Sequence, residues 1–340
     1  MTGVQQRQIS KDEDGLRLDR WFRKHFPKLS HGRLEKLLRQ GLVRLDGKRV
    51  KANARLAAGG TLRIPPEAHG ATAVVASGAA RPAGLRQSEL APLVKTLQQA
   101  ILHRDDDVIV LNKPSGLAVQ GGSKTKAHID AALPGLQFDA EEPPRLVHRL
   151  DRDTSGILLL ARNRKAAQFL TRQFAGRDVE KIYWALVYGV PRPARGHILV
   201  PLAKRAARDG GERVRPVEKS DPDAMSAHTD YAEIARIGQR FSWLAFRPKT
   251  GRTHQIRAHA AAIGHPLVGD GKYRLEGEGR EYGGILPKKL HLHARSIMIP
   301  HPSGGILRCD APLRDHMASS WDILGLDLND ADNPFAEDEA

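Results

Sequence analysis

Residues 146–161 read Leu146-Val147-His148-Arg149-Leu150-Asp151-Arg152-Asp153-Thr154-Ser155-Gly156-Ile157-Leu158-Leu159-Leu160-Ala161. The last five residues are an apolar run of the length expected for a buried strand. Such a strand holds the preceding loop in one geometry, and that loop packs two aspartates and two arginines into residues 149–153. By itself, the local pattern favours a solvated turn whose Asp and Ser side chains cap backbone groups. Motifs further along the chain point elsewhere.

Residues 148–156 resemble the signature of the RluA-type pseudouridine synthases, which isomerise uridine in RNA. Four other stretches match the same family in the right order. They are Leu111-Asn112-Lys113-Pro114-Ser115-Gly116, Lys181-Ile182-Tyr183-Trp184-Ala185-Leu186-Val187, Thr250-Gly251-Arg252-Thr253-His254-Gln255-Ile256-Arg257 and Leu292-His293-Ala294. A segment that resembles an S4 RNA-binding domain precedes them, so the resemblance extends over residues 15–322.

Three shorter stretches resemble the RluC-like branch of this family, which modifies large-subunit (23S) ribosomal RNA. They are Arg63-Ile64-Pro65-Pro66, Gln120-Gly121-Gly122-Ser123 and Gly211-Glu212-Arg213-Val214. The resemblance therefore implies specific uridines of that RNA as the substrate.

The composition favours a polyanionic partner. The chain of 340 residues has 54 Lys and Arg against 39 Asp and Glu, a formal net charge of +15. No apolar run approaches the roughly 18 residues that a membrane span needs, and the N-terminus lacks a signal-peptide pattern. The single cysteine, Cys309, excludes an internal disulfide and fits a reducing compartment. We therefore expect a cytoplasmic protein that binds RNA and no membrane.

Positive charge is concentrated in residues 15–64, where fourteen Lys or Arg stand against three acids. A helix after Ser30, with leucines at positions 34, 37 and 38, and a hairpin at Asp46-Gly47 are predicted there. The residues expected to contact RNA phosphates are Arg33, Lys36, Arg39, Lys48 and Arg49.

Strands interspersed with helices are predicted for the rest of the chain. The expected strands span 107–111, 157–161, 181–188, 241–247 and 291–299, and the expected helices begin at Asn163 and Thr253 as N-caps. Residues 93–102 form either a helix or an added strand, and residues 203–226 are expected to be a long loop near the RNA. This pattern predicts an α+β fold with a mixed, mostly antiparallel sheet and flanking helices, which the resemblance supports.

The predicted organisation has five segments. They are a disordered N-terminal tail (1–14), an S4-like RNA-binding domain (15–66), a linker rich in Ala, Gly and Pro (67–92), a catalytic domain (93–322) and an acidic C-terminal tail too polar to fold (323–340).

The resemblance implies roles for three catalytic residues. Asp151 is the essential carboxylate, which attacks the ribose C1′ or the base or abstracts a ribose proton; the residues do not separate these routes. Arg257 pairs with Asp151 and keeps it ionised, although a surface arginine that binds phosphate would look the same in sequence. Tyr183 matches the pocket tyrosine, whose ring stacks on the flipped base and whose hydroxyl is placed for the C5 proton.

The remaining candidates bind substrate or support the site. Arg149 matches the arginine that holds the extruded nucleotide, and Leu292 is expected to form an apolar wall. Lys113 either contacts a phosphate or stabilises its turn. We expect Asp153 to be structural, with its side chain accepting backbone hydrogen bonds. The histidines at 148, 254 and 293 are expected to be hydrogen-bonded structural residues rather than general bases.

Uridine isomerisation is redox-neutral and uses no external nucleophile, so neither a cofactor nor a metal is expected. His291, His293 and His301 could ligate a metal, but no acidic residue accompanies them. A monomer is expected by resemblance. Two alternatives remain: an S4-type ribosome-assembly protein without catalysis, and a synthase that acts on tRNA.

Overall fold

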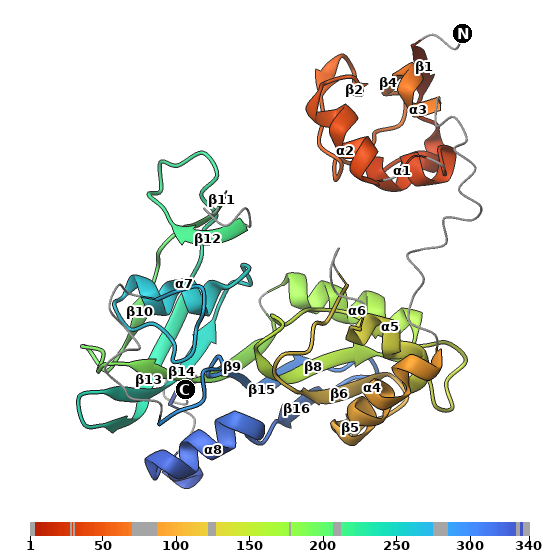
Figure 1. The fold of residues 1–340 in the computed structure, drawn as a ribbon. Coiled ribbons are helices and arrows are strands. Elements are labelled where there is room, and N and C mark those ends of the chain that lie inside the picture. The colour runs from red at the N-terminus through yellow and green to blue at the C-terminus, as the bar shows by residue number, and fades with distance from the viewer. Residues whose placement is uncertain are drawn as a thin grey trace. The chain divides into compact units, whose positions relative to one another are not determined.

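The computed structural model describes residues 4–27, 29, 31–69, 87–121, 127–176, 178–206, 212–274, 285–330 and 334–335 (Figure 1). The chain divides into two compact units, Met1–Pro82 and Ala83–Ala340. Among the described residues, no helix combines the length and the apolar character needed to cross a membrane.

The first unit is a small sheet covered by helices. Its elements are β1 (Gln5–Gln8), η1 (Lys11–Glu13), α1 (Leu18–His25), α2 (His31–Arg39), β2 (Arg44–Leu45), β3 (Lys48–Arg49), β4 (Thr61–Ile64) and α3 (Pro66–His69). The strands pair antiparallel in the order β1-β4-β2-β3. Trp21 and Phe22 of α1 and the leucines of α2 fill the core beneath this sheet.

The structure confirms the predicted α2 helix and the hairpin at Asp46-Gly47, where both residues adopt positive φ. Ser30, the expected N-cap, lies outside the described residues. The expectation of a disordered tail over residues 1–14 is wrong for β1 and η1. Gln5–Gln8 pair with β4, and Glu13 is buried.

The second unit is built on one large sheet. Its strands are β5 (Ile101–Arg104), β6 (Val108–Lys113), β7 (Arg145–Leu146), β8 (Ser155–Ala161), β9 (Glu180–Tyr188), β10 (Arg195–Ile198), β13 (Thr229–Ile237), β14 (Phe241–Pro248), β15 (Leu292–Pro300) and β16 (Ile306–Asp310). A separate hairpin comprises β11 (Leu202–Ala206) and β12 (Glu212–Pro216). The helices are α4 (Gln87–Gln99), α5 (Ile129–Ala132), η2 (Leu133–Leu136), α6 (Arg164–Ala175), α7 (Gln255–Ala262), α8 (Asp315–Leu324) and η3 (Leu328–Asp330).

The sheet runs β10-β13-β14-β9-β15-β8-β6-β5, with β16 beside β15 and β7 beside β8. Its described pairs are antiparallel except β15 with β8. This confirms the expected α+β fold with a mixed, mostly antiparallel sheet. All seven residues of β8 are buried, as the apolar run predicted. Because β8 and β9 both border β15, the sheet brings the loop before β8 near the strands of the other half.

Gly156 sets the spacing between β8 and β15. Its φ is +100°, and a Cβ at this position would lie 2.2 Å from the carbonyl oxygen of Ala294. Only glycine tolerates both the dihedral and the close approach. The first residues of β8, which directly follow the charged loop, therefore pack closely against β15.

Several sequence expectations need correction. Residues 93–102 contain both alternatives, since α4 begins at Gln87 and is followed by β5; most of the expected linker, residues 70–86, lies outside the described residues. Residues 203–226 are not one long loop, because Leu202–Ala206 and Glu212–Pro216 pair. The C-terminal segment is not uniformly unfolded. Helix α8 continues to Leu324, and Phe335 is buried with the ring 4.4 Å from the Arg247 guanidinium carbon.

Candidate active site

The second half of the charged loop before β8, residues 151–154, is held by the turn that follows β6. Ser115 Oγ donates to the Asp153 carbonyl at 2.8 Å, and Arg152 Nε donates to the Gly116 carbonyl at 3.0 Å. Within the loop, the Thr154 amide bonds to the Asp151 carbonyl at 3.2 Å. Two sequence motifs that lie almost forty residues apart therefore fix each other's backbone.

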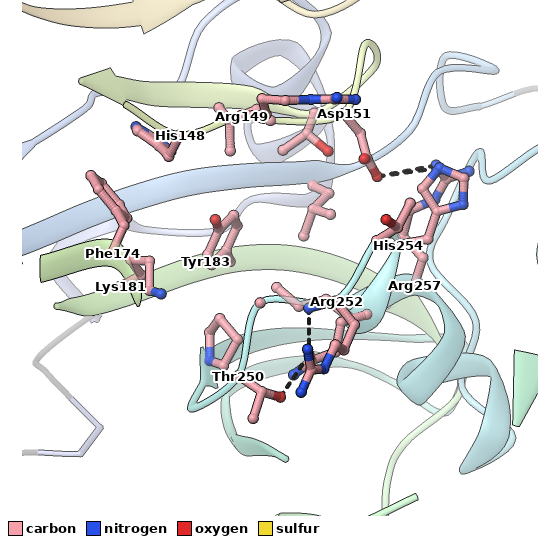
Figure 2. A pocket seen from close by; sticks show the side chains of 18 of the residues that line it. His148, Arg149, Asp151, Phe174, Lys181, Tyr183, Thr250, Arg252, His254 and Arg257 are labelled. Atoms are coloured by element: carbon pink, nitrogen blue, oxygen red, sulfur yellow. Dashed lines mark hydrogen bonds and ion pairs between the residues drawn. The ribbon is translucent and has the colours of Figure 1, made fainter. Parts of the chain in front are cut away.

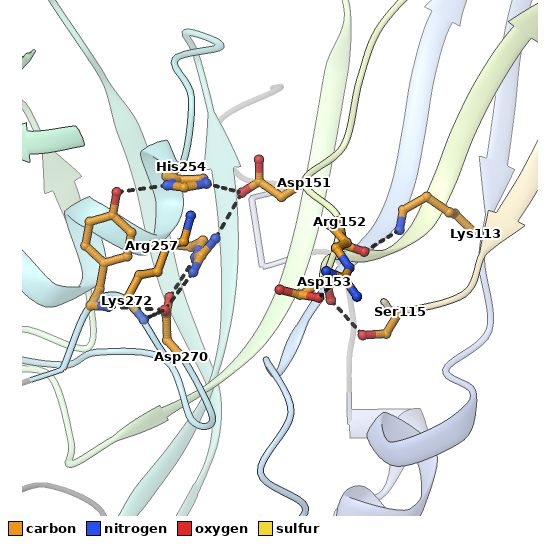
Figure 3. Close-up of polar contacts among 10 residues, drawn as sticks. Lys113, Ser115, Asp151, Arg152, Asp153, His254, Arg257, Asp270 and Lys272 are labelled. Carbon is orange, nitrogen blue, oxygen red and sulfur yellow. Dashed lines mark hydrogen bonds and ion pairs between the residues drawn. The ribbon is translucent and has the colours of Figure 1, made fainter. Parts of the chain in front are cut away.

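Lys113 is the buried anchor of this arrangement (Figure 3). Its amine donates to the carbonyls of Pro114, Leu117 and Arg152 at 2.9–3.0 Å, and the residue is 0% exposed. Burial lowers the pKa of Lys113 to about 7, while the carboxylates of Asp153 and Asp151 oppose that shift. Of the two alternatives left open for Lys113, these contacts favour the residue that stabilises its turn over the one that contacts a phosphate.

Asp151 leaves the loop toward a cavity and meets residues from α7. Its Oδ2 lies 3.4 Å from Arg257 Nη1 and 3.6 Å from His254 Nε2 (Figure 2). The Asp151 side chain is 26% exposed, whereas that of Arg257 is 5% exposed. The structure thus brings together the carboxylate and the arginine that the sequence paired, across 106 residues of chain.

A second carboxylate, which the sequence analysis missed, holds Arg257 more tightly. Asp270 accepts from Arg257 Nε and Nη2 at 2.7 Å each, and its side chain is fully buried. The backbone amides of Lys272 and Tyr273 also donate to Asp270 Oδ1. Asp270 fixes two nitrogens of the guanidinium, so the third is presented to Asp151.

His254, not Thr253, is the N-cap of α7. Its φ of 53° places it in the left-handed region, and no side chain caps this helix. The imidazole Nδ1 lies 3.0 Å from the Tyr273 hydroxyl, while Nε2 faces Asp151. Burial and the neighbouring cations Arg257 and Lys272 lower the pKa of His254, against the effect of Asp151. His254 therefore lies between the Tyr273 hydroxyl and the Asp151 carboxylate.

Tyr183 and Lys181 project from one face of β9 into the same cavity as Asp151 (Figure 2). Burial, together with the Asp151 carboxylate, raises the pKa of the Tyr183 phenol. Burial lowers the pKa of Lys181. Leu292, 3% exposed at the start of β15, contributes an apolar wall. Tyr183 and Leu292 therefore both line the cavity, as the sequence analysis expected.

The opposite rim is formed by the start of the charged loop. Arg149 is exposed and lines the cavity, whereas His148 stacks on Phe174 at 4.3 Å between ring centroids. His148 Nε2 accepts from the Leu159 amide at 2.9 Å. Burial and Lys181 lower the pKa of His148 to about 3, so this imidazole is neutral. Its contacts are those of a structural residue.

Two further sequence expectations concern side chains that flank the site. The Asp153 side chain is 56% exposed. Ser115 Oγ donates to the Asp153 backbone carbonyl and not to its carboxylate, which differs from the expectation that this side chain accepts backbone hydrogen bonds. His293 lies buried between Ser155 Oγ at 2.8 Å and the Ala311 carbonyl at 3.1 Å. These contacts place His293 in the framework that joins β8 to β15.

The cavity has a volume of about 700 Å³, which lies within the range of small-molecule sites. Among the described residues that line it, Asp151 is the one carboxylate. Five basic side chains surround that carboxylate: Arg149, Lys181, Lys204, Arg252 and Arg257. A single carboxylate in a basic, partly apolar hollow has the chemistry to accommodate a nucleotide.

The first unit carries the other expected RNA contacts. Arg33, Lys36 and Arg39 are exposed on α2, and Lys48 and Arg49 are exposed on β3. Leu34, Leu37 and Leu38 are buried on the opposite side of α2. Helix α2 therefore has a basic exposed face and an apolar buried face.

Comparisons with known proteins agree on one family. Residues 107–262 match the model of the RNA pseudouridylate synthase family. The chain is 35% identical over 320 residues to ribosomal large subunit pseudouridine synthase C of Vibrio cholerae, covering 93% of this chain and 95% of that protein. The corresponding protein of Escherichia coli K12 is 34% identical over 314 residues, covering 90% of this chain and 92% of its own.

A solved structure shares the fold. Human RNA pseudouridylate synthase domain containing 4 matches with a TM-score of 0.59 and 29% identity, over 70% of this chain and 97% of that one. The shared fold, the family match over the residues that carry Asp151 and Arg257, and the near full-length relatives lead to one assignment. The chain belongs to the RNA pseudouridylate synthase family, whose members isomerise uridine in RNA.

Proposed function

We propose that this enzyme converts specific uridines of large-subunit ribosomal RNA to pseudouridine, with Asp151 as the essential carboxylate. The observation that carries the proposal is the meeting of Asp151, Arg257 and Tyr183 in one basic cavity. The names of the two bacterial relatives support the large ribosomal subunit as the target.

The reaction breaks the N-glycosidic bond, turns the uracil and joins its C5 to the same ribose carbon, after which C5 loses its proton. Each route considered for Asp151 requires an ionised carboxylate beside the sugar and the base of the bound nucleotide. Arg257, fixed by Asp270, places a positive charge 3.4 Å from the Asp151 carboxylate. No electron is exchanged with an outside group, so the chemistry calls for no cofactor.

Tyr183 is proposed to contact the flipped base with its ring. Because its pKa is raised, the phenol keeps its proton at neutral pH. It therefore serves better as a stacking surface and hydrogen-bond donor than as the base that removes the C5 proton. Arg149 at the rim is proposed to hold the extruded nucleotide through its guanidinium.

The basic face of the first unit is proposed to bind RNA through phosphates, with Arg33, Lys36, Arg39, Lys48 and Arg49 as contacts. Such contacts increase affinity without selecting a base. A ribosomal RNA substrate would place the enzyme in the cytoplasm, and a monomer is proposed from the family resemblance alone.

The decisive experiment replaces Asp151 with asparagine, which keeps the shape and removes the charge. Pseudouridine formation is measured on ribosomal RNA from a strain that lacks the gene, alongside RNA affinity by titration. We expect D151N to lose detectable turnover with little change in affinity. D153N is the matched control, because that side chain is 56% exposed, and it should retain turnover.

Retained turnover in D151N would remove Asp151 from its assigned role. Modification of tRNA but not of ribosomal RNA by the wild-type enzyme would contradict the proposed target. Binding to ribosomal RNA without modification of any RNA would favour an assembly protein.

A further inference from the structure

A cross-strand row of polar residues lies at the β10 edge of the large sheet, where β10, β13 and β14 run side by side (Figure 1). His197 on β10 is paired in register with Asp230 on β13, and Asp230 is paired with Arg247 on β14. His228, two residues before Asp230, joins them. None of these residues lines the cavity that contains Asp151.

Two imidazole nitrogens converge on one oxygen of Asp230. His197 Nδ1 lies 2.6 Å and His228 Nε2 lies 2.8 Å from Asp230 Oδ1. All three potential ligand atoms lie within 4.8 Å of one another, and the described part of the chain contains no other such group of three. The His228 Nε2 atom is buried and makes no hydrogen bond of acceptable geometry there.

Neighbouring basic side chains hold the Asp230 carboxylate in one orientation. The Asp230 side chain is 4% exposed. Its second oxygen, Oδ2, accepts from Arg247 Nε at 3.2 Å and lies 3.2 Å from Arg247 Nη2 in an ion pair. Lys249 Nζ lies 3.7 Å from the same oxygen. Because the basic residues occupy Oδ2, Oδ1 is directed at the two histidines. An orienting partner of this kind is typical behind a metal-ligating carboxylate.

From this geometry we infer that His197, His228 and Asp230 form a binding site for a divalent cation of the zinc class. Two imidazole nitrogens and one carboxylate oxygen are ligands that Zn²⁺ accepts at about 2.0–2.2 Å, and slight opening of the cluster would admit an ion at its centre. Mg²⁺ and Ca²⁺ prefer all-oxygen sites and do not suit this set. The His197 side chain is 66% exposed, so water can complete the coordination.

The neighbouring cations limit the strength of the site. Arg247 and Lys249 offset the charge of Asp230, and their repulsion weakens the binding of a further positive ion. We therefore expect micromolar rather than nanomolar affinity for Zn²⁺.

The site would connect the sheet edge to the cavity rim. The His228 amide donates to Thr250 Oγ1 at 3.0 Å, and Gln255 Nε2 donates to the His228 carbonyl at 2.9 Å. Thr250 and Gln255 both line the active-site cavity. A bound ion would therefore tie strand β10 to the segment that supports Thr250 and α7. This inference rests on no part of the proposed catalytic function.

The test uses untagged, full-length enzyme freed of metal by a chelator and then titrated with ZnCl₂ in a calorimeter. We expect one ion per chain and an increase in the unfolding temperature with Zn²⁺. Co²⁺ should bind with the visible absorption of a low-coordinate nitrogen–oxygen site. H197A and H228A should each weaken Zn²⁺ binding by at least about tenfold.

H103A is the matched control. His103 Nε2 lies 2.6 Å and His301 Nε2 lies 3.2 Å from Asp105 Oδ2, but these three atoms, unlike those of the proposed site, do not all lie within 4.8 Å of one another. The Zn²⁺ affinity of H103A should equal that of the wild type. The unfolding temperature of each metal-free variant shows whether its fold is intact, and exposed His197 provides a substitution that leaves the core unchanged.

Absence of saturable Zn²⁺ binding to the wild type would overturn the inference. Equal Zn²⁺ affinity in the wild type, H197A and H228A would also overturn it, because the ion would then bind elsewhere. A loss of affinity confined to the two histidine variants supports it, whatever the outcome for Asp151.

Discussion

Arg257 contacts two carboxylates that differ in environment. Asp270 is fully buried and holds the guanidinium through two bonds of 2.7 Å, whereas Asp151 is partly exposed and contacts it once at 3.4 Å. The ion pair with Asp270 fixes the position of the Arg257 guanidinium. The longer contact places that positive charge beside the Asp151 carboxylate. Asp270 is therefore a positioning residue.

Replacing Asp270 with asparagine should leave Arg257 buried without its ionic partner. We expect a loss of about 3–5 kcal/mol in unfolding free energy, as for other broken buried pairs. The single-turnover rate should fall about a hundredfold because the guanidinium is misplaced, while RNA affinity changes little. Denaturant unfolding and rapid-quench kinetics measure these effects. An unchanged rate in a folded D270N enzyme would contradict the positioning role, and D153N again provides the control.

Lys113 provides a second prediction for a single side chain. In K113M, the carbonyls of Pro114, Leu117 and Arg152 lose their donor, which should cost about 1–3 kcal/mol for unpaired buried groups. Because Arg152 follows Asp151, turnover should fall as well. The control K165M removes an exposed lysine on α6 and should change stability by less than about 0.5 kcal/mol. Equal thermal unfolding of both variants would exclude the anchor role.

The sequence identified some of these residues and not others, for a physical reason. Asp151, Tyr183 and Arg257 lie in motifs that can be recognised, and the structure brings them together. Asp270 lies between Gly269 and Gly271, a pattern typical of turns. Only the tertiary structure shows that this turn faces Arg257.

The strands and helices whose apolar residues recur at a regular spacing could be predicted from the sequence. Strands β6, β8, β9 and β14 and helix α6, with Asn163 accepting from the Ala166 amide at 2.8 Å, follow the sequence pattern. The β11–β12 pair could not be predicted, because Leu202–Ala206 and Glu212–Pro216 are rich in charged residues and contain no apolar run. The cap of α7 was misplaced by one residue, because a left-handed φ at a histidine leaves no signature in the spacing.

The junction of η1 with α1 gives a prediction about pH. Burial alone would raise the pKa of Glu13, but hydrogen bonds, among them those from the Ser10 amide and the His25 imidazole, lower it to about 2. A carboxyl whose folded pKa lies below its unfolded value stabilises the fold above about pH 4.5 and loses that effect as pH falls toward 2.

Protection of the α1 amides from hydrogen exchange in the full chain should therefore decrease between pH 4.5 and 2, after correction for intrinsic rates. E13Q should show lower protection at pH 7 and a flatter dependence on pH. E35Q, at an exposed position on α2, is the control and should follow the wild type. A wild-type profile in E13Q would show that Glu13 does not couple these elements.

At the level of the whole molecule, the chain divides into a small basic unit and a larger unit that contains the complete cavity. All described residues of that cavity lie between Gln120 and Leu292. Catalysis should therefore depend on the larger unit, and much of the RNA affinity on the small basic unit.

Removing residues 1–82 should weaken binding to ribosomal RNA and flatten its dependence on salt, because phosphate contacts are lost. Turnover on short RNA fragments should persist. Affinity titrations between low and high salt, together with pseudouridine mapping, measure both effects. A truncated protein that folds but is inactive on fragments would show that residues 1–82 contribute to the chemistry itself.

The unequal hold on Arg257 also bears on motion during the reaction. Two short bonds keep the guanidinium in place, while one longer contact leaves the Asp151 side chain free to swing about its own single bonds. In the reaction proposed above, the Asp151 side chain can therefore move toward the sugar while the Arg257 guanidinium stays in place. The protein therefore combines a fixed positive charge, on Arg257, with a carboxylate that can move, on Asp151.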